Sequence, residues 1–140
     1  MKIKVCYKEL SDYIRKNYHK EIDMRHVSTD TIDVSFSKEI NLLIIRKKMQ
    51  VRLNVTVKKY ENNTLYIFYN YASEIKPIVN VAISLLSKKL GNNVFSVNTV
   101  SREAEIYLSN IKNMNDILYK VIINSIEFDE EGMVVNCSLL

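Results

Sequence analysis

The chain has 140 residues, 47% of them hydrophobic and 26% charged, which is typical of a globular protein with one domain, residues 1–140, that folds without disulfides or a metal. It has no run of about eighteen apolar residues, which excludes a transmembrane helix, and its first ten residues lack the apolar core of a signal peptide. We therefore expect a cytoplasmic protein, unless a signal peptide has been removed. The net charge of +4 accompanies many Ile, Asn, Lys and Tyr residues, so a low-GC genome explains it without a nucleic-acid partner.

The first third of the chain predicts two strands and a short helix. Residues 2–7 alternate between apolar and polar side chains, as a strand does. Residues 10–19 have the spacing of an amphipathic helix with cations towards its C-terminal end. Residues 26–36 return to alternation, with a turn or bulge at Asp30 and Thr31, and predict a second strand.

Residues 40–71 predict the centre of an antiparallel sheet. Apolar residues occupy every second position from 49 to 57, and an aromatic-rich run covers 65–71. Residues 61–64, Glu-Asn-Asn-Thr, supply turn chemistry between them, because Asn tolerates positive φ. We expect a hairpin here. At residues 46–48, Arg-Lys-Lys, the sequence leaves a turn and a bend open.

Residues 73–90 predict the longest helix. Its polar residues form a narrow stripe, and apolar residues cover far more than the usual third of its surface. Pro77 suits its first turn, and Gly91 is well placed to end it. We expect this apolar helix to be enclosed by a curved sheet or by a partner.

The last third predicts further strands and one short helix. Residues 94–100 form a strand, and residues 101–111 fit a strand or a helix, of which we favour the strand. Residues 116–124 predict a short helix, and residues 125–128 and 133–139 a closing hairpin. The predicted fold is α+β, with a mostly antiparallel, curved sheet packed on one long apolar helix and two shorter helices.

The tail from Glu105 to Leu140 resembles the closing pattern of tubular lipid-binding domains of the bactericidal/permeability-increasing type. The resemblance is carried by IYLSNI, the short NDILYKVI helix and SIEFDEEGMVVNCSL. Such domains wrap a strongly curved sheet around a long helix, so the resemblance implies lipid binding and supplies the surroundings that residues 73–90 require. It implies no catalytic site, and most such proteins are exported or associated with membranes.

No motif points to catalysis, a cofactor or a metal. P-loop, dinucleotide-binding, serine-hydrolase and zinc-protease motifs are missing from the sequence, and two glycines are too few for a loop that holds phosphate closely. We therefore expect no enzyme, no cofactor and no metal site. Cys6 and Cys137 could form one disulfide between strands, but we favour two reduced thiols.

The favoured function is a non-enzymatic binding or interaction domain that holds a lipid or another hydrophobic ligand between the sheet and the long helix. Its partner is a hydrophobic small molecule or a protein, including a second copy of the chain. The candidate ligand-binding residues are Ile78, Val79, Ala82, Leu85 and Leu86 of the helix and Val55, Ile67 and Tyr69 of the hairpin.

The alternative function is nucleic-acid binding by the basic hairpin 46–59. Its candidate residues are Arg46, Lys47, Lys48, Arg52 and Lys58, and aromatic residues that could stack on bases follow them. We consider this partner the weaker hypothesis, because Lys at a strand edge and Tyr in a strand are ordinary features of soluble sheets.

Overall fold

The computed structural model describes residues 1–140, except for the side chains of residues 40–42 and 45. In the part of the chain so described, two antiparallel sheets and three α-helices confirm the predicted α+β class. The elements are β1 (Lys2–Cys6), α1 (Tyr7–Tyr18), β2 (Ile22–His26), β3 (Thr31–Leu42), β4 (Ile45–Glu61), β5 (Thr64–Asn70), the 3-10 turn η1 (Ser73–Ile75), α2 (Lys76–Leu90), β6 (Phe95–Asn98), β7 (Glu103–Tyr107), the 3-10 turn η2 (Leu108–Asn110), α3 (Met114–Leu118), β8 (Val121–Phe128) and β9 (Gly132–Leu139).

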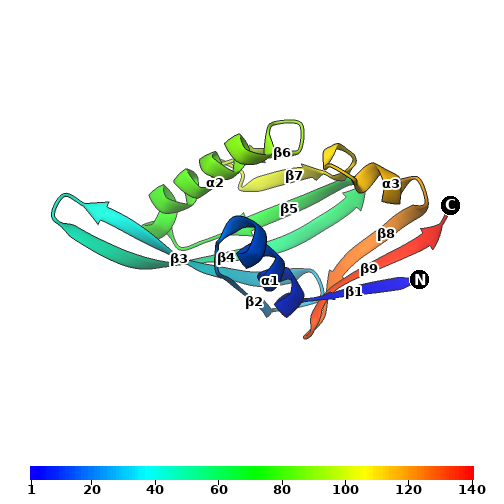
Figure 1. The fold of residues 1–140 in the computed structure, drawn as a ribbon, viewed down its shortest axis with the longest axis horizontal. Coiled ribbons are helices and arrows are strands. Elements are labelled where there is room, and N and C mark those ends of the chain that lie inside the picture. The colour runs from blue at the N-terminus through cyan, green and yellow to red at the C-terminus, as the bar shows by residue number, and fades with distance from the viewer.

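The larger sheet has the strand order β2-β3-β4-β5-β7-β6 (Figure 1). The predicted hairpin is confirmed as β4 and β5, which pair with Val55 opposite Tyr69. Asn62 and Asn63 both have positive φ, 53° and 58°, as a tight hairpin turn requires, and Asn is one of the few residues that adopts this conformation readily. Beyond the body of the sheet, β3 and β4 continue as a projecting two-stranded arm (Figure 1).

The smaller sheet, of order β1-β9-β8, holds both chain termini at the same end of the molecule (Figure 1). Its closing hairpin confirms the prediction for residues 125–139. Strand β8 packs near β4 of the larger sheet. The Phe128 backbone N–H also donates to the Thr29 carbonyl oxygen at 2.7 Å, so a backbone hydrogen bond joins β8 to the turn between β2 and β3.

Two helices cover the larger sheet. Helix α1 is fastened to β2 by the Ser11 hydroxyl, which donates to the Ile22 carbonyl oxygen at 2.9 Å. Helix α2 covers β4 and β5, because Val79 joins Val51 and Tyr69 in one buried cluster. The alternation of β4 places its apolar residues on the face that meets α2, as the sequence predicts.

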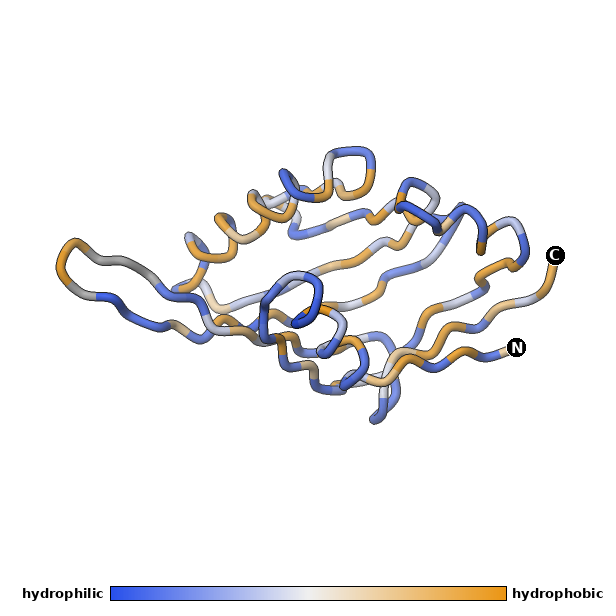
Figure 2. Tube along the Cα trace, viewed as in Figure 1, coloured by the Kyte–Doolittle hydropathy of each residue, from blue (hydrophilic) through white to orange (hydrophobic). Residues whose placement is uncertain are grey.

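The expectation of one long apolar helix enclosed by the sheet was wrong, whereas its enclosure by a partner stays a prediction. Residues 73–90 are helical, but as η1 followed by a 15-residue α2. Val79 is buried, whereas Val81 and Leu85 on the other side are 50% and 56% exposed. A sheet that covers one side of a helix leaves the opposite side in water, and the exposed Val81 and Leu85 make that side partly apolar. Much of α2 is hydrophobic along its length (Figure 2). None of the helices among the described residues is long and apolar enough to cross a membrane.

Two strand boundaries in the first half differ from the prediction. The predicted turn near Asp30 is confirmed, and the strand after it is β3, which begins at Thr31; the predicted range differs at its start, because His26 ends a separate strand, β2. The Ser28 hydroxyl donates to the Asp30 carboxylate at 2.8 Å, and this local bond favours a turn over continued pairing. Residues 46–48 form neither a turn nor a bend, because they are extended in β4, and the chain turns earlier, at residues 43–44.

The later elements are confirmed with one correction. The strand preferred for residues 101–111 exists as β7, followed by η2. The helix predicted over 116–124 was wrong beyond Leu118, because Val121 already begins β8. Pairing with β9, where Val121 lies opposite Leu139, overrides the helical spacing of this stretch.

The two cysteines lie far apart in the smaller sheet. Cys6 of β1 lies opposite Gly132, and Cys137 is five residues further along β9. Five residues of strand span about 17 Å, whereas a disulfide needs Cα atoms within about 7 Å. A bond between them within one chain is incompatible with this fold, and both are thiols.

Candidate functional site: an apolar groove beneath helix α2

A groove of about 650 Å³ lies between α2 and the larger sheet. Its floor consists of side chains that strand alternation places on one face, and neighbouring strands bring these residues into register. Helix α2 forms the opposite wall, and α1 and the segment after η2 contribute to the rim. The lining residues are Tyr18, Leu53, Val55, Ile67, Tyr69, Ile83, Leu86, Lys89, Leu90, Asn93, Val94, Phe95, Ala104, Ile106, Asn110, Ile111 and Lys112.

Half of the predicted ligand-binding residues line this groove: Val55, Ile67, Tyr69 and Leu86. The others lie elsewhere. Ile78 and Val79 pack in the cluster around Val51, and Ala82 and Leu85 do not line the groove, Leu85 being mostly exposed. That any of these residues binds a ligand stays a prediction.

Several lining residues escaped the sequence reasoning. Ile83 and Leu90 could have been found, because they lie three to four residues from Val79 and Leu86 and therefore share one face of the helix. No signal in the sequence pointed to Tyr18 or Ala104, since only the tertiary structure brings α1 and β7 to this groove.

The charged side chains that line the groove are two lysines, Lys89 and Lys112. Lys89 lies in the last turn of α2, and Lys112 follows η2. Among the described lining residues there is no carboxylate to neutralise them. The Lys89 ammonium lies 4.8 Å from the centre of the Tyr18 ring, a cation–π contact that connects α1 with α2 at the rim. An otherwise apolar groove thus carries positive charge at its rim.

Tyr69 supplies a buried polar atom in the same groove. Its residue is only 4% exposed, its ring stacks on that of Tyr71 with 6.1 Å between centroids, and its hydroxyl has no hydrogen-bond partner among the described residues. Burial raises the pKa of this phenol above its usual 10. A buried hydroxyl without a hydrogen-bond partner costs about 1–3 kcal/mol.

The other face of the same sheet carries a polar hollow of about 810 Å³. There Tyr66 and Glu105 pair across β5 and β7, alternating with the groove residues Ile67 and Ala104. The Lys58 ammonium lies 2.8 Å from the Glu103 carboxylate, and the Lys59 ammonium lies 4.8 Å from the centre of the Tyr66 ring. Both members of the Lys58–Glu103 pair are about half exposed, which is typical of an ordinary solvated sheet surface.

The cations of the nucleic-acid hypothesis do not form one surface. Arg46, Lys47 and Lys48 are exposed on the projecting arm, Arg52 lies further along β4, and Lys58 is engaged with Glu103. Arg46 and Lys58 are twelve positions apart along β4, which corresponds to about 40 Å of extended strand. The basic hairpin therefore contains one compact cluster, at residues 46–48, and two separate cations.

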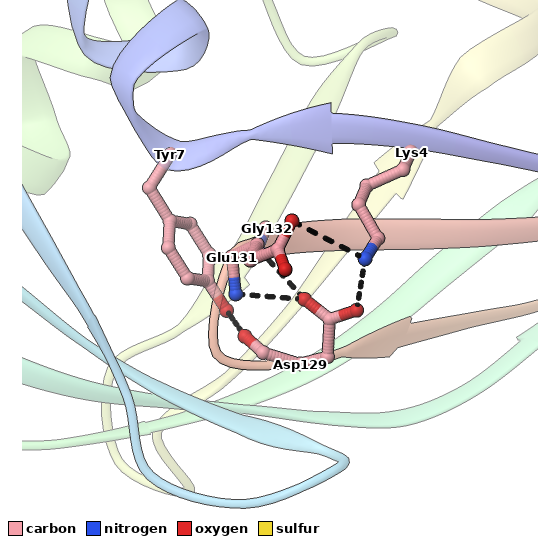
Figure 3. A network of polar contacts seen from close by, with 5 residues as sticks. All are labelled: Lys4, Tyr7, Asp129, Glu131 and Gly132. Carbon is pink, nitrogen blue, oxygen red and sulfur yellow. Dashed lines mark hydrogen bonds and ion pairs between the residues drawn. The ribbon is translucent and has the colours of Figure 1, made fainter.

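A polar network at the β8–β9 turn has a structural role (Figure 3). The Asp129 carboxylate lies 2.7 Å from the Lys4 ammonium and accepts hydrogen bonds from the Glu131 and Gly132 backbone N–H groups at 2.8 and 2.9 Å. These bonds, led by that from Lys4, lower the pKa of Asp129 to about 2. The Tyr7 hydroxyl donates to the Asp129 carbonyl oxygen at 2.6 Å, so the network connects β1 and α1 to the turn.

Comparison with protein-family models, with curated proteins and with solved structures yields no match for this chain. Among the described residues, no group of three His, Cys, Asp or Glu side chains is arranged to hold a metal ion. The groove beneath α2, with its two lysines and its unpaired tyrosine, is therefore the candidate site that the molecule itself offers.

Proposed function

We propose that this chain is a non-enzymatic binding protein whose groove beneath α2 holds an amphiphile with an anionic head, such as a long-chain fatty acid. The observation that carries this proposal is a largely apolar groove with lysines as its charged lining residues. Its volume of about 650 Å³ lies in the range of pockets for small ligands, about 300–1,000 Å³.

The hydrocarbon chain would lie between the sheet and α2, with Val55 and Ile67 below it and Leu86 above. Its transfer from water would supply most of the binding free energy, at about 25 cal/mol per Å² of buried apolar area. The curved sheet of the sequence prediction would be the floor of this site.

The head group would be held at the rim. Lys89 and Lys112 offer two ammonium groups, and hydrogen bonds between charged groups are worth about 1.5–3 kcal/mol when they are partly protected from water. The Tyr69 hydroxyl would become a further donor to an oxygen atom of the ligand once the side chains that cover it move aside, which would relieve the cost of its burial without a partner.

A comparison of two ligands tests this function. Titration calorimetry would measure a long-chain fatty acid and the neutral alcohol of equal length, with the wild-type protein and with the double variant Lys89→Glu/Lys112→Glu. We expect the wild-type protein to bind the acid about tenfold or more tightly than the alcohol, in line with a bond to a charged group, and the variant to lose this preference while still binding the alcohol.

The matched control is Lys76→Glu combined with Lys88→Glu, which makes the same charge change on exposed positions of α2 that do not line the groove. It should keep the preference for the acid. Failure of both ligands to bind saturably, or an equal loss in the control, would contradict the proposal. Native mass spectrometry of protein purified from its own source would identify the natural ligand.

The other predictions add little to this choice. The resemblance of residues 105–140 to tubular lipid-binding domains is compatible with a lipid ligand, but it stays a prediction. Nucleic-acid binding across the basic hairpin gains no support from cations that lie about 40 Å apart along β4.

A further inference from the structure

The projecting arm, defined as residues 37–50 of β3 and β4 with their turn, ends in apolar side chains. Leu43 and Ile44 form the turn at its tip, and both are fully exposed. The tip of the arm is coloured as hydrophobic in Figure 2. Tight turns are ordinarily built from Gly, Asn, Asp and Pro. Two large apolar side chains exposed to water at such a position indicate an interaction site.

The arm is also strongly basic. Its sequence contains four cations, Lys38, Arg46, Lys47 and Lys48, against one carboxylate, Glu39. The Arg46 guanidinium lies 3.9 Å from Glu39, so part of this charge is offset. Strand alternation places Arg46 and Lys48 on one face of the arm and Lys47 on the other. Cations therefore stand behind the apolar tip on both faces.

The root of the arm is firmly anchored. Phe36 pairs with Val51, and Val51 is completely buried in the cluster that includes Val79 of α2. The tip is thus presented by paired strands that are rooted in the hydrophobic core.

We propose that this arm docks the protein on a lipid bilayer that carries anionic headgroups. Leu43 and Ile44 enter the boundary between headgroups and acyl chains, and Arg46, Lys47 and Lys48 contact the lipid phosphates. In a bilayer an apolar layer lies just beneath negatively charged headgroups. The arm has the matching arrangement, because its tip is apolar and the residues behind the tip are basic. Two apolar side chains alone bind weakly, and stable docking needs a basic cluster as the second signal.

Nucleic acid fits the arm less well. Phosphates would satisfy the cations, but the two apolar tip residues would have no matching layer, and residues 37–50 contain no aromatic side chain that could stack on a base. Docking goes beyond ligand binding in the groove, and its evidence is independent of Lys89 and Lys112.

Vesicle sedimentation tests the inference. Phosphatidylcholine vesicles with and without phosphatidylserine would be titrated at low and high salt. We expect the wild-type protein to bind vesicles with phosphatidylserine, and to release them at high salt. The triple variant Arg46→Glu/Lys47→Glu/Lys48→Glu should bind them about a hundredfold or more weakly, because each cation near such a surface contributes about fivefold.

The tip variant Leu43→Ser/Ile44→Ser should bind about tenfold or more weakly with an unchanged salt dependence, because the apolar contribution alone is removed. Both positions are fully exposed, so the variant should keep the wild-type unfolding temperature. A tip variant with wild-type affinity would overturn the insertion of Leu43 and Ile44.

The control for charge is Lys2→Glu/Lys8→Glu/Lys20→Glu, which makes an equal charge change at exposed positions outside the arm and should retain clearly more binding than the arm variant. An equal loss in the control would overturn docking by the arm, and so would salt-sensitive binding of an oligonucleotide without binding of vesicles. The groove variant Lys89→Glu/Lys112→Glu, like the charge control, should retain clearly more vesicle binding than the arm variant, so that failure of docking and failure of the groove function are distinguished.

Discussion

The hydroxyl of Tyr69 offers a sharp test of the groove, because the ligand-free protein should become more stable when this hydroxyl is removed. Tyr69→Phe deletes one oxygen atom and keeps the ring that stacks on Tyr71 and packs against Val51 and Val79. Most substitutions in a core destabilise a protein, so the opposite sign would be informative.

The magnitude follows from the surroundings of the hydroxyl. A buried hydroxyl without a partner costs about 1–3 kcal/mol, and the small void left by one oxygen atom offsets part of the gain from removing it. We expect Tyr69→Phe to raise the free energy of unfolding by about 1 kcal/mol, which corresponds to about 4 °C in the unfolding temperature for a chain of this size.

The sign of the pH dependence is also fixed. Burial raises the pKa of the folded Tyr69 phenol above 10, so the folded state resists losing this proton while the unfolded state loses it at the ordinary value. The wild-type protein should therefore lose stability as the pH rises through 10, and the advantage of Tyr69→Phe should grow there.

Urea unfolding of delipidated protein measures these differences, and Tyr71→Phe is the matched control. Tyr71 is in the same ring stack but is 9% exposed, and its hydroxyl is not among the buried atoms without a partner, so its removal should change stability less. If Tyr69→Phe lowers the free energy of unfolding by about 1 kcal/mol or more, the hydroxyl has a partner in the ligand-free protein and is not available to a ligand.

The β8–β9 turn supports two further predictions. A Cβ atom at Gly132 would lie 2.2 Å from the Val5 carbonyl oxygen, so Gly132→Ala should force β1 away from β9 and cost about 3 kcal/mol in urea unfolding, with Ser138→Ala as a nearly neutral control. The bonds from Lys4 and from the turn lower the pKa of Asp129 to about 2 in the folded protein, from 3.8 ordinarily, so Asp129 stabilises the fold above about pH 4, and this contribution is lost as the pH falls towards 2. Asp129→Asn should remove this part of the acid dependence, and a variant with an unchanged acid-unfolding curve would contradict the role assigned to Lys4.

Sequence patterns predicted the elements whose signals are local. The alternation of apolar residues in β4 and β5 and the two Asn residues between them, which have positive φ, were enough to predict the hairpin. Both signals are local, because each lies within a few adjacent residues. Residues 119–124 show the limit of such reasoning. Their helical spacing was real, but pairing with β9 decides their conformation, and the partner strand is distant in the chain.

Side-chain periodicity alone predicts the α+β class and the apolar faces of β4, β5 and α2, because it fixes which face of each element leaves water. Four of the eight proposed ligand-binding residues line the groove for this reason. Only the tertiary structure decided that α2 is covered on one side, that Tyr18 and Ala104 complete the groove with Lys89 and Lys112 at its rim, and that the basic residues after Ile44 stand behind an apolar tip. These arrangements depend on how the strands pair and how the helices cross the sheet. They cannot be predicted from the sequence pattern, because a contact between two distant segments leaves no periodic signal in either segment.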